Sequence, residues 1–290
     1  MKLSKSTWII FAVGIALRLV LWCFQSAPEG DDGLRYLSES VNMVRHGVFS
    51  TASFLEAKGV PSPSAHDLPL WPSIMAGYYW MTDSIRCTQY LAGLTNIFLC
   101  ALGVLMLCSM LKNKPFGFSD RQVAVGCGVY LFMPDTIIYS LCHMPDQLAV
   151  TAIIVSLWFY FRVATGCRLA LVGATLSFVT AIYAKPICIP LSGALILALT
   201  LILKDVWWKK ATMMLACGLA LAACLHPWTV RNRHAFGTAG LTTISGTNLY
   251  ACNWGRLVEQ LPSAEKAKEQ ESMVRQAKLG RTNRMKGICT

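Results

Sequence analysis

Long apolar stretches alternate along the chain with short polar connections. Seven of them are long enough, at ~1.5 Å per residue, to cross ~30 Å of hydrocarbon with modest help from their flanks. They are residues 7–25, 86–111, 122–141, 148–164, 169–184, 187–203 and 211–225. An eighth run, residues 70–81, would reach only ~18 Å as a helix and contains Pro72 and Gly77, which predicts a helix lying at the membrane interface. The pattern predicts an all-α polytopic membrane protein with about seven transmembrane helices.

Basic residues orient this arrangement. With seven crossings, the basic connections 112–121, 162–168 and 204–210 fall on the same side as Lys2 and Lys5, which is the cytoplasmic side. Counting residues 70–81 as a crossing would place these connections outside. The seven-crossing arrangement predicts a membrane module over residues 1–227 with a large outer loop, 26–84, followed by an outer-face loop and charged tail over residues 228–290.

Composition agrees with a membrane protein, since 54% of the residues are hydrophobic and only 14% are charged. The net charge of +11 is explained by the basic connections and tail, so we expect membrane lipids and no nucleic acid as partners. The cysteines form no CxxC pair and no zinc spacing, which argues against metal-thiolate chemistry.

The outer loop begins with acidic residues and an amphipathic segment. Leu37, Val41 and Val44 recur at the spacing of a helix over residues 36–44, and we predict a surface helix resting on the bilayer. Charges from distant segments fall on the same outer face, and polar groups at the edge of the hydrocarbon cost free energy unless they are partnered. We therefore expect one assembled site from Asp31, Asp32, Asp67, Asp146, Lys185, Arg231 and Arg233.

Several short landmarks follow one another in order along this face. They are Asp32 with Tyr36, then Leu68-Pro69-Leu70-Trp71-Pro72, then Met133-Pro134 followed by Pro145-Asp146, then Ala184-Lys185-Pro186, and finally Pro227-Trp228-Thr229-Val230-Arg231-Asn232. In order and spacing the chain resembles the integral-membrane glycosyltransferases of the C fold. The most similar groups are the protein mannosyltransferases and the bacterial transferases that add aminoarabinose and related sugars to lipid A.

The resemblance implies transfer of one sugar from a polyprenyl monophosphate donor to a lipid, glycan or protein acceptor on the outer side of a membrane, here the periplasmic side of a bacterial inner membrane. The acidic residue of the family's first outer loop maps onto Asp32, with Asp31 beside it, and that of the second loop maps onto Asp146. An arginine often precedes the family's proline where this chain has Lys185. No cofactor is certain, and a divalent metal is one option that the carboxylates leave open.

The residue types suit this chemistry. Displacing a lipid phosphate from an anomeric carbon needs a carboxylate to accept the proton of the attacking hydroxyl, which Asp32 can do. Cations stabilise the negative charge on the departing phosphate, and Lys185, Arg231 and Arg233 can supply them. Tyr36, His66 and Asp67 lie beside these residues in the sequence pattern and complete the predicted substrate-binding set.

Each of these residues also has a structural interpretation. Asp31, Asp32 and Asp146 stand where helix N-caps are expected, and Lys185 could extend from a helix end to the interface. Arg231 and Arg233 could bind lipid headgroups nonspecifically. His66 is more often a structural residue, with Asp67 as the partner that fixes it.

Two other functions remain open. A polytopic bundle with charges at the membrane edge could transport a lipid or a solute, although the chain has no internal repeat and Arg18 is its one charge near a midplane. A shortened, inactive relative acting as a partner is the third possibility.

Overall fold

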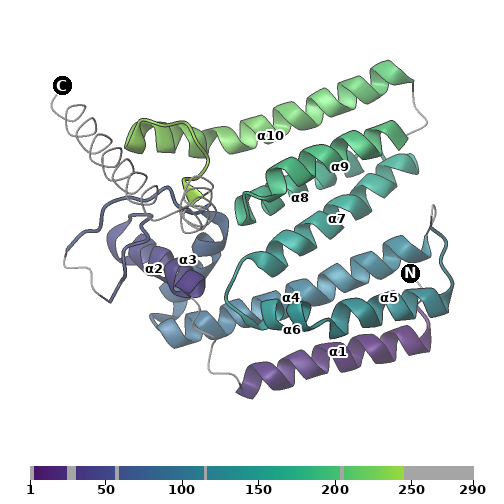
Figure 1. Ribbon diagram of the computed structural model, residues 1–290, viewed down its shortest axis with the longest axis horizontal. Helices are drawn as coiled ribbons and strands as arrows, with labels where there is room; N and C mark the ends of the chain where they lie inside the picture. The colour runs from purple at the N-terminus through teal and green to yellow at the C-terminus, as the bar shows by residue number, and fades with distance from the viewer. Residues whose placement is uncertain (1–2, 25–30, 56–58, 114–115, 203–205, 245–290) are drawn as a thin grey trace, which may run out of the picture. The chain divides into compact units, whose positions relative to one another are not determined.

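The computed structural model describes residues 3–24, 31–55, 59–113, 116–202 and 206–244 (Figure 1). The regular structure of these residues is ten helices: α1 (Lys5–Phe24), α2 (Asp31–His46), α3 (Leu70–Thr82), α4 (Ile85–Lys112), α5 (Asp120–Phe132), α6 (Pro134–Leu141), α7 (Asp146–Ala164), α8 (Ala170–Ala184), α9 (Cys188–Ile202) and α10 (Trp207–Phe236). The predicted all-α fold class is confirmed. The charged tail predicted at the end of residues 228–290 lies outside the described residues.

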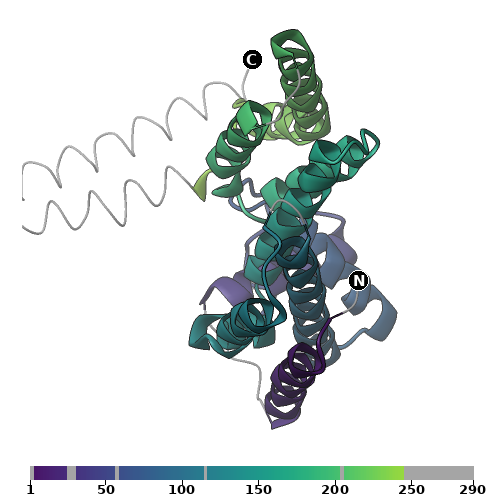
Figure 2. The same ribbon diagram turned by 90° about the vertical axis from the view of Figure 1, so that its right-hand side faces the viewer.

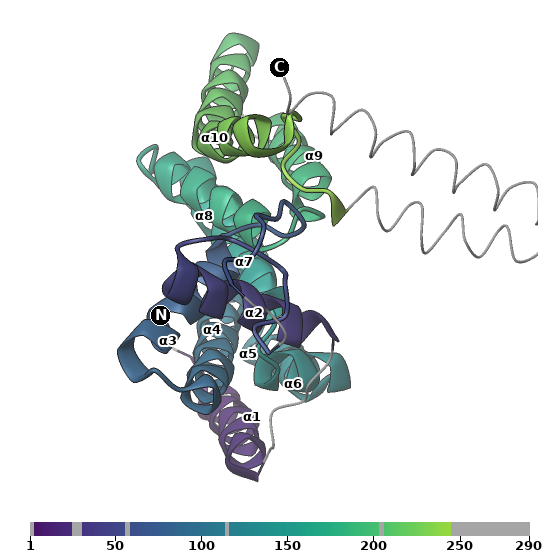
Figure 3. The same cartoon turned by 90° about the vertical axis from the view of Figure 1, so that its left-hand side faces the viewer.

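Within residues 1–241 the long helices lie alongside one another in alternating directions (Figure 1). Helix α4 packs on α1, α5 and α7, and α7 packs on α8, which in turn contacts α9 and α10. Figure 2 faces the end at which α4 connects to α5 and α7 connects to α8. Helices α2 and α3 lie across the opposite end, which Figure 3 faces.

Four helices, α1, α4, α7 and α10, are long and apolar enough to span a membrane. Helices α5 and α6 make a fifth candidate if the pair, which is bent by 56°, counts as one span. The described parts of α8 and α9 are apolar but shorter than this test requires. Length and composition therefore give four or five candidate spans, which is compatible with an integral membrane protein, and the predicted count of about seven is not confirmed.

Proline explains one break inside a predicted stretch and one break between two predicted stretches. The stretch 122–141 divides at Met133, and the polypeptide turns between α8 and α9 at Lys185. Both residues have extended backbones and precede a proline, whose ring disfavours a helical conformation in the residue before it. The helix α10, in contrast, continues through Pro227 and ends only at Gly237, which has a φ of +71° that glycine adopts without strain.

The charge predicted near a midplane is fully partnered. Arg18 on α1 is completely buried and donates hydrogen bonds to Ser140 Oγ at 2.9 Å, to the Gly14 carbonyl at 3.0 Å and to Thr136 Oγ1 at 3.2 Å. These bonds satisfy the guanidinium where it is shielded from water and fasten α1 to α6. Arg18 therefore has the contacts of a structural residue.

The predicted helices of the outer loop form but pack on protein. The apolar face of α2 is buried, with Leu37 and Val41 in one cluster with Trp71, Met75 and Tyr79 of α3. Side chains at three- and four-residue spacing share one face of a helix, so a single face of α2 can be covered by α3. The expected position of α2, with this face resting on the bilayer, is therefore corrected: the face is covered by α3.

Candidate functional site at the end of the bundle

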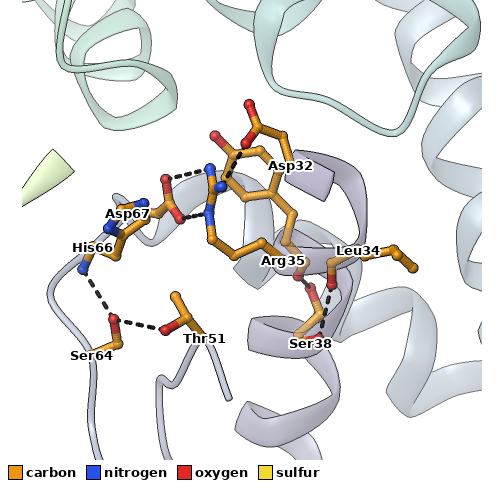
Figure 4. Close-up of polar contacts among 10 residues, drawn as sticks. Asp32, Leu34, Arg35, Ser38, Thr51, Ser64, His66 and Asp67 are labelled. Carbon is orange, nitrogen blue, oxygen red and sulfur yellow. Dashed lines mark hydrogen bonds and ion pairs between the residues drawn. The ribbon is translucent and has the colours of Figure 1, made fainter. Parts of the chain in front are cut away.

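The centre of the candidate site is Arg35 on the first turns of α2. Its Nη1 donates to Asp32 Oδ1 at 2.5 Å, its Nε donates to Asp67 Oδ2 at 2.5 Å, and its Nη2 donates to Asp67 Oδ1 at 3.3 Å (Figure 4). The Asp67 side chain is 4% exposed, whereas that of Asp32 is 53% exposed. Arg35 thus joins one buried carboxylate to one accessible carboxylate.

The fold brings these groups together in two ways. Asp32 and Arg35 are three residues apart on α2 and therefore neighbours on its surface. Asp67 comes from the loop that leads to α3. That loop is held against α2 by Asn42, whose Nδ2 donates to the carbonyls of Ser50 at 3.0 Å and Ala52 at 2.8 Å.

A third acid, Glu39, lies one helical turn beyond Arg35 and is fully buried. Its carboxyl lies beside that of Asp67, with which it can form a hydrogen bond only when one of the two groups carries a proton. Burial raises the pKa of Glu39 well above its ordinary value, and the nearby Asp67 carboxylate raises it further, whereas Arg35 opposes the shift. Glu39 is therefore a neutral acid at physiological pH.

An open polar cleft of about 460 Å³ adjoins this cluster. One wall of the cleft is α2, and the other is the segment between α2 and α3. The residues that line it are Leu34, Arg35, Ser38, Thr51, Ser53 and His66. Figure 4 shows Thr51 and His66 on the loop beside Arg35 on the helix. The hydroxyls and the imidazole supply donors and acceptors of the kind that hold a polyhydroxylated ligand.

The predicted residues of this region have the following positions. Asp32 lies in the first turn of α2, and its carboxylate accepts a hydrogen bond from the Arg35 guanidinium. This contact is not that of a helix N-cap, in which the carboxylate would accept from a backbone N–H. Tyr36 is buried and belongs to the core that α2 shares with α3. The expectation that Asp67 fixes His66 is wrong, because Asp67 is bound by Arg35. The side chain of Asp31 lies outside what the structure describes.

The second pair of predicted residues forms an ion pair. Lys185 Nζ donates to Asp146 Oδ1 at 2.5 Å, and the side chains are 29% and 20% exposed. Asp146 Oδ2 is buried and has no hydrogen-bond partner among the described residues. The carboxylate of Asp146 makes no capping hydrogen bond to α7, and Lys185 has a specific partner on another helix.

Arg231, near the end of α10, lies in an aromatic cage. Its guanidinium carbon is 4.7 Å from the centroid of the Trp228 ring, 5.2 Å from that of Phe236 and 5.7 Å from that of Phe49. Nη1 donates to the Ser64 carbonyl at 2.7 Å, which ties α10 to the outer loop. Nε and Nη2 have no hydrogen-bond partner among the described residues.

Arg233, two residues later, differs from Arg231 in its surroundings. The residue is exposed, and within the described residues its side chain makes no ion pair. The structure therefore fixes Arg231 against the outer loop and leaves the Arg233 side chain on the surface of α10.

A close contact joins the first turn of α2, which carries Asp32, to the connection between α6 and α7, which precedes Asp146. A Cβ on Gly33 of α2 would lie 2.4 Å from His143 Nε2, so a larger residue at this position would require the imidazole to move. His143 precedes Asp146 in the connection between α6 and α7, and its carbonyl accepts a hydrogen bond from Trp71 Nε1 at 2.9 Å. The connection that carries Asp146 is therefore packed directly on the first turn of α2 and on α3.

Six of the seven charges predicted to share a face have side chains that the structure describes. Five of these make specific contacts at one end of the bundle, namely Asp32, Asp67, Asp146, Lys185 and Arg231, whereas Arg233 is exposed there without an ion pair among the described residues. The sequence interpretation missed Arg35, Glu39 and His143. The spacing of Asp32 and Arg35 on one helical face was an available signal for the first of these. The contact with Asp67 had no signal in the sequence, because thirty-two residues separate the partners.

No group of three or more metal-binding side chains is found among the described residues. A divalent metal therefore stays an untested expectation.

No protein-family model matches the chain. No curated protein matches it with significant similarity.

Proposed function

We propose that the protein is an integral-membrane glycosyltransferase that moves one sugar from a polyprenyl monophosphate donor to a hydroxyl of a lipid, glycan or protein acceptor. The observation that supports the proposal most directly is that Arg35, which holds the accessible Asp32 carboxylate, also lines an open cleft with several polar side chains. The resemblance in the order of the sequence landmarks is its second support.

In this proposal Asp32 is the general base. The acceptor oxygen attacks the anomeric carbon, its proton passes to the Asp32 carboxylate, and the bond from the anomeric carbon to the phosphate oxygen breaks. The electron pair of that bond leaves with the polyprenyl phosphate. A direct displacement of this kind inverts the anomeric configuration. Arg35 fixes the direction of the Asp32 carboxylate through Oδ1, which leaves Oδ2 to face the acceptor.

The cleft residues are assigned to the sugar and the acceptor. Ser38, Thr51, Ser53 and His66 offer hydrogen-bonding groups at its walls, and their number suits a ligand with many hydroxyls. Tyr36 and Asp67 act indirectly, since Tyr36 is in the core and Asp67 holds Arg35.

The three cations have different roles in the proposal: Arg231 and Arg233 hold the donor phosphate, and Lys185 does not. Arg231 has donors left after its bond to Ser64, and Arg233 is exposed on the same helix end. An arginine suits phosphate because its planar fork can form two hydrogen bonds at once. Lys185 is bound by Asp146, so we assign this pair to positioning the connection between α8 and α9.

The proposal includes seven membrane crossings, by α1, α4, α5 with α6, α7, α8, α9 and α10. In support, these helices alternate in direction, and Lys5, Lys112, Arg162 and Lys209 all lie toward the end away from α2 and α3 (Figures 1 and 2). Basic residues favour the cytoplasmic side, so the cleft would face the outside, which is the periplasm in a bacterial inner membrane.

The test is sugar transfer by the full chain in proteoliposomes, using a radiolabelled polyprenyl phosphosugar and a lipid or glycan acceptor fraction. Asp32→Asn should lower transfer by about 100-fold or more, since it removes the base and keeps the size of the side chain. Asp120→Asn is the matched control, because Asp120 is 56% exposed and also pairs with a cation, Lys112. Equal transfer by the parent and Asp32→Asn would overturn the assignment of the base, and absence of transfer by the parent from all tested phosphosugars would overturn the proposed reaction.

A further inference from the structure

The contact between α8 and α10 contains a groove whose lining is separate from that of the cleft beside Arg35. It consists of two adjacent cavities that share Leu171 and Ala216 in their linings. The first has a volume of about 320 Å³ and the second about 210 Å³. Nearly the whole lining of the second is apolar, with Val172, Leu176 and Ala220 among its residues.

The sequence of α10 explains why space remains between the helices. Trp208, Thr212, Ala216, Ala220 and Cys224 recur every four residues and line the groove. Residues at this spacing lie above one another on a helix, and four of the five are small. From Trp208 to Cys224 the stripe rises by about 24 Å, at ~1.5 Å for each residue step, which exceeds half of the ~30 Å thickness of a hydrocarbon layer.

The groove is charged at one end only. Arg168 and Lys209 line its first cavity, at the basic end of the bundle, and the Lys209 ammonium lies 5.4 Å from the centroid of the Trp208 ring. Within the described part of the chain no carboxylate pairs with either cation. At the other end the helices are joined, because Tyr183 Oη donates to the Cys224 carbonyl at 2.7 Å.

We propose that this groove binds one anionic phospholipid of the leaflet at the basic end of the bundle. The phosphate lies between Arg168 and Lys209, Trp208 lies at the level of the headgroup, and one acyl chain follows the stripe toward Cys224. Paired cations beside an apolar groove complement a lipid that has an anionic head and a hydrocarbon tail. The inference depends on the helices spanning a membrane and is independent of sugar transfer.

The donor polyprenyl phosphate is a poorer occupant of this groove. Its phosphate would have to lie near Asp32 and Arg231, at the end where Tyr183 joins α8 to α10. The cations of the groove are at the opposite end. Charge therefore favours a phospholipid whose head lies at the basic surface.

The experiment is native mass spectrometry of the full chain in detergent, titrated with phosphatidylglycerol and, separately, with phosphatidylcholine. Arg168→Gln with Lys209→Gln should weaken phosphatidylglycerol binding by roughly 25-fold, at about five-fold for each cation near a membrane surface. Lys5→Gln with Arg121→Gln removes the same charge from the same end of the bundle outside the groove, and should change binding by less than about two-fold.

A second variant tests the acyl part of the site. Ala216→Phe fills the position shared by the two cavities while leaving both cations in place, and should also weaken binding. Brominated phosphatidylglycerol should quench the fluorescence of the parent more than that of Trp208→Phe. The proposal is overturned if the control double variant weakens binding as much as the groove variant, which would indicate a diffuse basic surface, or if Ala216→Phe binds phosphatidylglycerol as tightly as the parent.

Discussion

Arg35 binds Asp67 through two hydrogen bonds, from Nε at 2.5 Å and from Nη2 at 3.3 Å, and so joins the first turns of α2 to the loop that precedes α3. The pair links residues thirty-two positions apart, and Asp67 is nearly inaccessible to water. Planar guanidinium and carboxylate groups that meet in this way fix orientation as well as distance.

Replacement of Arg35 should therefore destabilise the protein more than replacement of Asp32. Arg35→Gln leaves the buried Asp67 carboxylate without its cation, which typically costs about 3–5 kcal/mol of unfolding free energy. Asp32→Asn removes only the exposed ion pair between Arg35 and Asp32, and it should lower the unfolding free energy by less than about 1 kcal/mol. Unfolding of the purified chain in detergent measures both changes, and equal stability of the two variants would contradict this ranking.

Glu39 should make stability depend on pH. The folded state holds a proton on this buried acid, whereas the unfolded state releases it above the ordinary pKa of 4.5. Its contribution to stability is fully present below pH 4.5 and is lost as the pH rises toward the raised pKa of the folded state. Glu39→Gln removes the group that releases a proton on unfolding. The difference in unfolding free energy between parent and variant should therefore change by about 1.4 kcal/mol per pH unit from pH 5.5 to 8. Parallel pH profiles would show that Glu39 is ionised in the folded protein.

Arg231 should hold the outer loop against α10 whether or not a donor is bound. Arg231→Ala removes the bond to the Ser64 carbonyl and the contacts with Trp228 and Phe49. A hydrogen bond from a charged donor is worth about 1.5–3 kcal/mol, so hydrogen exchange of the Ser64 amide, which is bound to the Phe49 carbonyl, should become at least about tenfold faster.

Arg233→Ala is the control for this experiment, because Arg233 has the same charge two residues away and is exposed. The same acceleration in both variants would mean that positive charge near the loop, and not the cage around Arg231, limits the exchange.

Two native cysteines can test the orientation in the membrane. Cys87 is exposed at the start of α4, near α2 and α3, and Cys167 is exposed in the connection between α7 and α8 at the opposite end. An impermeant maleimide added to intact cells should label Cys87 and reach Cys167 only after the membrane is opened. Cys87→Ser and Cys167→Ser identify the two signals. Labelling of both from the same side would exclude the proposed seven crossings.

The sequence by itself determined where the helices lie, with one clear error in their limits: residues 228–236, predicted as part of an outer-face loop, continue α10. Apolar runs of sufficient length, the helical spacing in α2 and the short apolar run of α3 are local patterns, and the structure contains a helix at each of them. The breaks at Met133 and Lys185 are also local in origin, since a proline restricts only the residue before it. The prediction missed the first break because it treated residues 122–141 by their hydropathy alone.

Tertiary structure decided which charges are paired. Asp67 was expected to be the partner of His66, yet the folded loop brings it to Arg35. Arg231 was expected to contact phosphate, and in the fold three aromatic rings and the Ser64 carbonyl hold its guanidinium while the residue stays partly exposed. The physical reason is that a buried charge is stable only beside a partner of suitable geometry, and the packing of distant helices and loops determines which partner comes within reach.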